Sequence, residues 1–391
     1  MNFKKSDKVW EWLMKSGIGF SKGKIERGSG LARSAVMKYK TDFNRLMKMV
    51  EKETGKNDPM KVKPNDVYKV IDKLIKEYHA GNKAHANFLR GVDDALHAFK
   101  ECSKASGVYK RELRLGDKRV ISQKLNDEKV YRRSKDTTVM KASRDDMEKV
   151  VAQIEKSRAS REVKDVAINV VRLEFESGRR ISGILRSQVG NYNEKNGTYT
   201  TYGDKGGKDN ESFYLTNGAK EILNKLSRNE DGEKKKDGDM MFKVKYTQHK
   251  DPNKRGQDKS VDNIRKQVSN LIKNCAERAG VNRDGQKFSS HSCRKGYANE
   301  RADHYIDNMT AEERKEELER RKKQDKNLAE RIDKCLEHIK SKFEIEKNKE
   351  KREFTDIEII KLLVSTDINH SRLDVMRYYL MDYQFDFDSN D

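Results

Sequence analysis

Apolar residues along the chain recur mostly at intervals of three and four, which is the spacing that predicts amphipathic helices. In the first 110 residues this pattern predicts helices over about 31–54, 64–78 and 80–102. Gly55 follows the first helix as a stop signal, Pro64 begins the second, and Trp10 and Trp12 start a further helix that caps the others. We therefore expect a compact N-terminal helical domain with basic faces.

The pattern after residue 140 predicts a second domain with a small β-sheet. Helices are expected over 143–155 and 161–177, and Gly178 is expected to cap the latter in a left-handed conformation. Over 188–216 apolar and polar residues alternate around two Gly-containing turns, which predicts a three-stranded antiparallel meander. A helix over 217–227, a short strand in MMFKVKY and a long helix over 260–279 follow. The predicted fold class is mainly α with a small antiparallel β-sheet.

The segment 111–135 is highly charged and weakly periodic, so we expect an exposed basic linker between the two domains. The predicted boundaries are a helical domain over 1–110, a linker over 111–140 and a second domain over 141–391.

Charge narrows the class of partner. The chain has 86 Lys and Arg residues against 65 Asp and Glu, a net charge of +21, which points to a polyanion. No window approaches the roughly 18 consecutive apolar residues of a membrane span, and the first residues lack a signal-peptide core, so we expect a cytoplasmic protein without a membrane partner. The four cysteines form no Cys-x-x-Cys pair, which favours reduced structural thiols over disulfides or zinc ligands.

Four short segments hold the residues that could carry chemistry: ESGRRISGIL, YGDKGGKDN, SSHSCRKGYAN and NHSRLDVMRYY. Each segment alone has an ordinary explanation, namely a solvated helix start, a hairpin tip, a surface His-x-x-Arg pair and helix packing. Their order along the chain is more specific than any one of them.

This order resembles that of the tyrosine recombinases, the family of phage integrases and chromosome-dimer resolvases. The Gly-x-Arg-x-Ser pattern selects Arg180 rather than Arg179, and the nine-residue separation from His370 selects Tyr379 rather than Tyr378. Helix geometry alone leaves the choice between the two tyrosines open. The resemblance implies six catalytic positions: Arg180, Lys205, His291, Arg294, His370 and the nucleophile Tyr379.

The chemistry of the family explains these residue types. The tyrosine oxygen attacks phosphorus and a 5′-oxygen leaves, while Arg180 and Arg294 stabilise the charge that spreads over the phosphate oxygens. Lys205 would protonate the leaving oxygen, and the two histidines would bind the phosphate or assist proton transfer. The 3′-phosphotyrosyl product conserves the bond energy, so no metal, ATP or other cofactor is expected, and neither a Walker motif nor an acidic metal triad is visible in the sequence.

The resemblance also implies the partners. The helical domain would be a core-binding (SAM-like) domain that closes with the catalytic domain around specific sites in double-stranded DNA. The protein would be a homotetramer on DNA and a monomer or dimer off it. Phosphate contacts would dominate affinity, which should fall steeply with salt.

Three departures from the family are visible. Gly183 stands where an acidic residue is usual, and Asn369 replaces a glycine, a mild change because Asn tolerates left-handed backbone. His291 and His370 are 370 − 291 = 79 residues apart, which indicates a helical insertion over about 303–354. The insertion is either a surface hairpin or an element that packs on a neighbouring subunit or steadies the nucleophile segment. Its apolar stripe is Leu328, Ile332, Leu336, Ile339 and Phe343.

Beyond Tyr379 the short C-terminal tail is aromatic and acidic. Phe385 and Phe387 would either dock on the next protomer or belong to a frayed end.

Two other activities fit the same residues. A type IB topoisomerase shares the catalytic roles, and a DNA-binding protein on this fold could have lost catalysis. The N-terminal helical domain and the linker favour recombination, and the presence of all six positions argues against lost activity. The insertion favours the integrase of a mobile element over a dimer resolvase.

Overall fold

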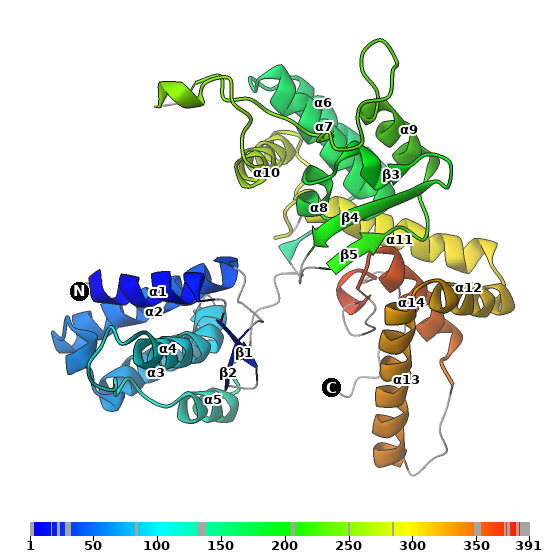
Figure 1. The fold of residues 1–391 in the computed structure, drawn as a ribbon. Helices are drawn as coiled ribbons and strands as arrows, with labels where there is room; N and C mark the ends of the chain where they lie inside the picture. Colours follow the sequence, from blue (N-terminus) through cyan, green and yellow to red (C-terminus); the bar gives the residue numbers. More distant parts are fainter. Residues whose placement is uncertain are drawn as a thin grey trace. The chain divides into compact units, whose positions relative to one another are not determined.

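The computed structural model divides the chain into two compact units, residues 1–134 and 135–391, which are described separately (Figure 1). The residues described are 4–16, 18–21, 24–27, 33–82, 85–131, 138–204, 208–248, 251–283, 285–347, 353–370, 373, 376–380 and 383. Most of them are helical, as the apolar spacing predicts, so the predicted fold class is confirmed.

The first unit packs its helices around an aromatic core. Phe43 and Phe99 stack with ring centroids 3.8 Å apart, and the fully buried Trp10 lies against both rings, because three amphipathic helices turn their apolar stripes inward. A short antiparallel hairpin, which the sequence pattern did not predict, follows the first helix. The elements are α1 (Lys4–Lys15), β1 (Ile18–Ser21), β2 (Lys24–Arg27), α2 (Arg33–Thr54), α3 (Pro64–His79), α4 (Ala86–Ser106) and α5 (Lys118–Asp127).

The prediction of an exposed linker is wrong for residues up to 130. Helix α5 lies in this segment, and five apolar side chains bury themselves in the core of the first unit. Arg90 fastens the end of the segment by donating hydrogen bonds to the carbonyl oxygens of Leu125 (3.1 Å) and Val130 (2.5 Å). The apolar residues are too widely spaced among charges for a helical period to stand out: Leu113, Leu115, Ile121, Leu125 and Val130. Residues 132–137 lie outside the described part of the chain.

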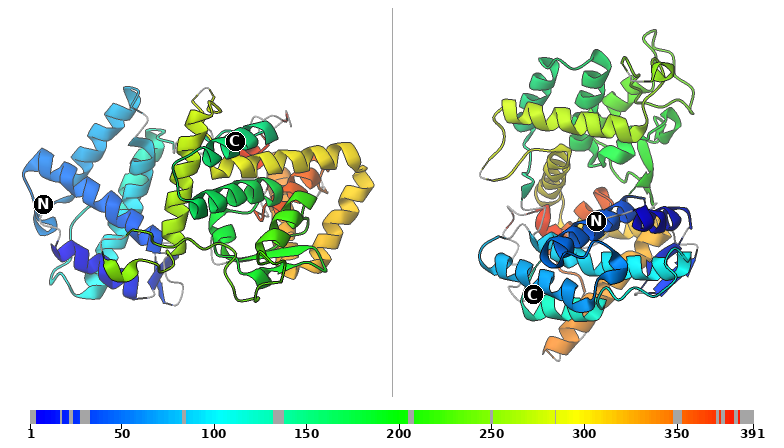
Figure 2. Two further views of the ribbon diagram at one scale, coloured as in Figure 1. Left: turned by 90° about the horizontal axis from the view of Figure 1, so that it is seen from above. Right: turned by 90° about the vertical axis from the view of Figure 1, so that its left-hand side faces the viewer.

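The second unit is built around α7 (Arg161–Ser177), which packs against helices on several sides (Figures 1 and 2). The antiparallel sheet has the order β3-β4-β5, as predicted, and β4 lies against α8. Its elements are α6 (Arg144–Glu155), α8 (Ile181–Leu185), β3 (Tyr192–Asn193), β4 (Thr198–Asp204), β5 (Lys208–Glu211), α9 (Asn217–Leu226), α10 (Val261–Arg278) and α11 (Ser290–Asn308).

The strand predicted in MMFKVKY is not formed. Residues 240–246 make only isolated bridges, Gln188 with Met240 and Lys245 with Asp258. Met241 N–H donates to the Ser187 carbonyl at 2.9 Å, and Phe242 and Val244 are buried in the core. Core packing therefore accounts for the apolar alternation here without a strand ladder.

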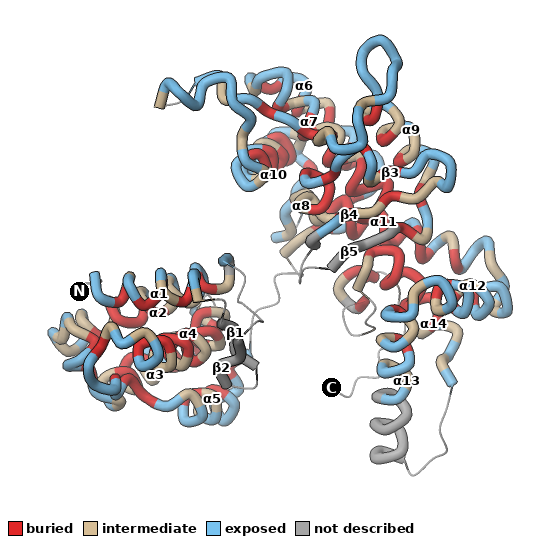
Figure 3. The backbone as a smooth tube through the Cα atoms, viewed as in Figure 1, coloured by how far each residue is buried: buried red, intermediate tan, exposed pale blue. Residues whose placement is uncertain are grey.

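The last part of the second unit is a helical cluster of α12 (Ala311–Gln324), α13 (Lys326–Lys347) and α14 (Asp356–Asp367), followed by a 3₁₀ turn, η6 (Met376–Tyr378). Every residue of α14 from Ile359 to Asp367 is buried, whereas α12 exposes one face (Figure 3). Leu328 and Ile332 of the predicted stripe are buried in the same core. The described part of the chain does not include the side chains of Ile339 and Phe343, or residues 385 and 387.

Within the described ranges, none of the helices is both long enough and apolar enough to cross a membrane.

Candidate active site

Five of the six predicted side chains meet around the hydroxyl of Tyr379. The hydroxyl oxygen lies 3.2 Å from His370 Nε2, 3.3 Å from His291 Nε2 and 3.3 Å from Arg294 Nε. Arg180 Nη2 lies 3.2 Å from the same nitrogen of His370. Lys205, the sixth predicted residue, lies outside the described residues. The cluster thus brings together residues that are up to 199 positions apart, from Arg180 to Tyr379 (379 − 180).

The turn after α7 separates the two adjacent arginines. Gly178 takes a left-handed conformation with φ 61°, and a Cβ there would overlap the ring of Tyr297, so glycine is required. Beyond this turn the side chain of Arg179 is buried, whereas Arg180 is partly exposed beside His370. Arg180, the residue that the Gly-x-Arg-x-Ser spacing selects, is therefore the arginine of the pair that lies beside His370.

His291 and Arg294 lie in the first two turns of α11, where a spacing of three places them on one face. Ser289 and Ser292 form a capping box that fixes the start of the helix. The Arg294 side chain is fully buried, and its two terminal nitrogens donate to the carbonyl oxygens of Gly178 and Ile368. Two main-chain acceptors thus set the orientation of the guanidinium.

His370 follows directly on the C-terminal cap of α14. The His370 N–H donates to the Ser365 carbonyl at 2.7 Å, and the Asn369 N–H donates to the Thr366 carbonyl at 2.9 Å. Asn369 has a left-handed φ of 53°, so these two bonds form a Schellman motif. Asn369 thus adopts the left-handed backbone that a Schellman motif needs at this position.

Tyr379 follows the 3₁₀ turn η6 and does not lie in an α-helix. Its N–H donates to the Met376 carbonyl at 3.0 Å, and its carbonyl accepts from Asn299 Nδ2 at 2.7 Å. The side chain is 6% exposed, whereas Tyr378 is only half-buried. Tyr379 is therefore the tyrosine of the pair whose hydroxyl reaches the cluster.

The contact between Arg180 and His370 determines which ring nitrogen of His370 carries the proton. A guanidinium nitrogen can only donate, so His370 Nε2 accepts from Arg180 and the neutral ring carries its proton on Nδ1. Arg294 Nε likewise donates to the Tyr379 oxygen. Because Arg180 takes the one lone pair of His370 Nε2, the phenol is left to donate its proton toward His291 Nε2. His370 Nε2 can accept that proton only when Arg180 turns to another acceptor. This is the arrangement that a nucleophilic hydroxyl beside a base requires.

Electrostatics keeps one of these imidazoles neutral. Burial, together with the nearby charges of Arg294, Lys295 and Arg180, lowers the pKa of His291 to about 3. At physiological pH the ring of His291 is therefore an uncharged acceptor beside a cationic cluster.

Glu174 is a buried acid of the site that the sequence motifs did not single out. Its Oε1 accepts the Ile181 N–H at 2.8 Å and so caps the short helix that begins after Arg180. Burial raises the pKa of Glu174 to about 8, although the Ile181 N–H, the charge of Arg294 and a hydrogen bond with Ser290 oppose the rise. In the sequence, the one feature that distinguishes Glu174 is that it is an acidic residue on an otherwise apolar face of α7.

The absence of an acidic residue at position 183 has a packing reason. A Cβ on Gly183 would lie 3.1 Å from the Cβ of Thr201, because α8 approaches β4 closely there. A longer side chain would push the two elements apart. Among the residues that the structure describes, no group of three or more His, Cys, Asp or Glu side chains is placed to hold a metal ion.

No protein-family model matches this sequence, and no curated protein matches it. Solved structures do. A lambda integrase (residues 75–356) bound to DNA is 12% identical, with a TM-score of 0.46 over 80% of this chain and 88% of that one. The XerH site-specific recombinase bound to a difH substrate is 15% identical (TM-score 0.34; 87% and 93% covered). The integrase from mycobacterium phage Brujita is 14% identical (TM-score 0.29; 78% and 82%). These are integrases and site-specific recombinases, the class that the sequence motifs resemble.

Proposed function

We propose that this chain is a site-specific DNA recombinase that cleaves and rejoins strands through a covalent bond between Tyr379 and a DNA 3′-phosphate. The observation that carries the proposal is the convergence of two imidazoles and the Arg294 guanidinium on the Tyr379 hydroxyl, at 3.2–3.3 Å. Ordinary packing of a buried tyrosine needs one hydrogen-bond partner and does not call for three ionisable neighbours.

In the proposed reaction the Tyr379 oxygen attacks phosphorus as its proton passes to His370 or His291. The bond from phosphorus to the 5′-oxygen breaks, and that oxygen takes a proton, which we assign to Lys205 by the resemblance alone. Arg180 and Arg294 provide planar, permanently charged forks where negative charge develops on the phosphate oxygens. Attack by the 5′-hydroxyl of another strand reverses the step and restores the phenol.

The charge of the chain supports DNA as the substrate. A net charge of +21 favours binding to a phosphate backbone, in a manner that falls steeply with salt. The matched lambda integrase and XerH structures are described as bound to DNA, one of them as a tetramer on a Holliday junction. We extend this to the present chain as a homotetramer on specific sites, with the first unit as a core-binding domain and the second as the catalytic domain. We assign the recombinase to a mobile element.

The test uses wild type, Tyr379→Phe and the matched control Tyr378→Phe. Each protein is incubated, with a chelator of divalent metals, with duplex fragments tiled across the DNA on both sides of its own coding sequence. SDS-resistant adducts of protein and DNA are then counted. We expect adducts in wild type and Tyr378→Phe, none in Tyr379→Phe, and a free 5′-hydroxyl that a polynucleotide kinase can label.

Three results would contradict the proposal in different ways. Adducts lost only in Tyr378→Phe would place the nucleophile at the other tyrosine. Relaxation of any plasmid without site preference would indicate a type IB topoisomerase. Tight, salt-sensitive binding without an adduct on any fragment would indicate a DNA-binding protein without catalysis.

A further inference from the structure

Helix α12, which lies in the insertion predicted from the sequence, binds both ends of the buried helix α14. Arg314 donates two hydrogen bonds to the Asp356 carboxylate at the start of α14, at 2.8 and 2.6 Å. Arg321 donates to the Leu363 carbonyl at 2.9 Å and to the Thr366 hydroxyl at its end. The two arginines are seven residues apart, which is about two helical turns, so they project from one face of α12.

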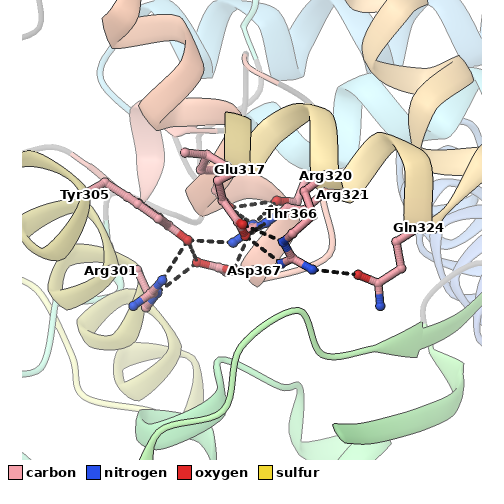
Figure 4. Close-up of polar contacts among 9 residues, drawn as sticks. Arg301, Tyr305, Glu317, Arg320, Arg321, Gln324, Thr366 and Asp367 are labelled. Atoms are coloured by element: carbon pink, nitrogen blue, oxygen red, sulfur yellow. Dashed lines mark hydrogen bonds and ion pairs between the residues drawn. The ribbon is translucent and has the colours of Figure 1, made fainter. Parts of the chain in front are cut away.

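The contact at the C-terminal end of α14 is the more deeply buried. The Asp367 side chain is fully buried, and Arg321 and Arg301 are 1% and 7% exposed. Arg301 Nε and Arg321 Nη1 each lie 2.9 Å from a carboxylate oxygen of Asp367 (Figure 4). Tyr305 Oη donates to Asp367 at 2.7 Å and accepts from both arginines at 2.7 Å. We call Arg301, Tyr305, Arg321 and Asp367 the α12–α14 cluster.

Burial alone would raise the pKa of Asp367, but the charges of Arg321 and Arg301 hold it below its ordinary value. The carboxylate is therefore charged at neutral pH and needs both arginines as partners. A carboxylate without water around it has few alternative positions, because each movement breaks a charged hydrogen bond.

This fixed carboxylate stands immediately before the turn that enters the active site. Asp367 is the last residue of α14, and the next three residues are the Schellman turn described above. Within that turn the Ile368 carbonyl accepts from Arg294, and His370 contacts Tyr379 and Arg180. One residue, Ile368, thus separates the α12–α14 cluster from the turn's left-handed Asn369.

We propose that Arg321 is a positioning residue: through Thr366 and Asp367 it sets the turn that aims His370 and the Ile368 carbonyl at the reacting groups. The inference rests on the proposed function and gives the insertion a task beyond packing. Arg314 holds the far end of α14, where its partner Asp356 precedes the first residue of that turn, Ile368, by twelve residues (368 − 356). It therefore supplies a matched control, a buried arginine of the same helix that grips the same partner helix.

The experiment compares Arg321→Met with Arg314→Met. Single-turnover formation of the Tyr379 adduct is measured at saturating DNA, below the melting temperature of both variants, and DNA affinity is measured separately. We expect unchanged affinity in both variants and a larger loss of melting temperature in Arg321→Met, because Asp367 is fully buried whereas Asp356 is 41% exposed. Only Arg321→Met should slow cleavage, by roughly tenfold to a hundredfold, since small misplacements of reacting groups have effects of this size. Arg321→Lys, which keeps the charge but not the fork, should recover only part of the rate.

A second readout does not depend on catalysis. The amide hydrogens of Asn369 and His370 are held by the Schellman bonds, so their exchange in the DNA-free protein should accelerate in Arg321→Met and not in Arg314→Met. If Arg321→Met does not fold, Thr366→Val removes the hydroxyl acceptor more gently and should give the same pattern. Equal effects of the two arginine variants on both readouts, or none, would overturn the inference. Absence of any adduct in wild type would overturn the proposed function instead, and the exchange result would still decide the positioning role.

Discussion

The side-chain amide of Asn299 donates a hydrogen bond to the main-chain carbonyl of Tyr379 at 2.7 Å. The same nitrogen also reaches the Lys295 carbonyl at 2.8 Å, one turn earlier on α11. Helix α11 carries His291 and Arg294, which contact the hydroxyl of the same tyrosine. One helix therefore holds Tyr379 at both its backbone and its side chain, and the position of the hydroxyl does not depend on η6 alone.

Replacing this amide should misplace the tyrosine. Asn299→Leu has similar volume but no donor, so a buried carbonyl loses its partner at a cost of about 1–3 kcal/mol. We expect single-turnover adduct formation at saturating DNA to fall by roughly tenfold or more. Asn169→Leu is the control, because Asn169 makes the same bond to a carbonyl four residues earlier, at 2.8 Å, but lies on α7 and, within the described part of the chain, makes no hydrogen bond with Tyr379. Equal rates in the two variants would contradict this role.

Glu174 should make the free energy of unfolding fall as pH rises, which is opposite to the effect of an acid whose pKa is lowered by folding. Its pKa is raised to about 8 by burial, so the folded state keeps a proton that the unfolded state releases above its ordinary value of 4.5. The resulting stability is present below pH 4.5 and is lost as pH rises toward 8, by about 1.4 kcal/mol per pH unit at the steepest. Glu174→Gln should lack this pH dependence. The melting temperature of Glu174→Gln should therefore rise relative to that of wild type between pH 5 and pH 8.

The control for this measurement is Glu176→Gln, which breaks an ion pair with Arg144 at 2.5 Å and should lose stability instead. Parallel pH curves for wild type and Glu174→Gln would show that the buried carboxyl is not protonated at neutral pH.

His291 should remain uncharged well below neutrality. Because its pKa is lowered to about 3, the unfolded state takes up a proton first as pH falls through 6.5. The contribution of His291 to stability is therefore complete above pH 6.5 and is lost as pH falls toward 3. In NMR spectra of the DNA-free protein, the imidazole resonances missing from His291→Gln should keep their neutral positions from pH 8 to pH 5. A midpoint near 6.5 for those resonances would refute the assignment.

Much of the candidate site could be predicted because its residues are organised by local spacing. A separation of three places His291 and Arg294 on one helical face, and Gly178 marks the turn before Arg180. The long separations between the segments carry no such information, so bringing them together required the family resemblance. Asn299 and Glu174 were missed because both act on main-chain groups, and a polar residue with that task looks like any other polar helix position.

The fold also divides into elements that the sequence pattern predicted and elements that it did not. Periodicity predicted the long helices, because each has several turns to average over. The three-stranded sheet was predicted although β3 and β5 have only two and four residues, because two Gly-containing turns divide the alternating segment. The β1–β2 hairpin, with strands of four residues each, was not predicted because alternation over so few residues is not distinctive. The segment ending at Val130 was misinterpreted as a linker because charged residues outnumber the apolar side chains that bury themselves.

The two acceptors that orient Arg294 are peptide carbonyls, of Gly178 and Ile368, a group that every amino acid possesses. Selection at these positions acts on backbone shape, which requires glycine at 178 and tolerates a change of side chain at 368 wherever the turn is kept. A lineage could exchange nearly all the residues around the guanidinium without altering its aim. Evolutionary drift of this kind would erase detectable sequence kinship while leaving the reacting groups in place.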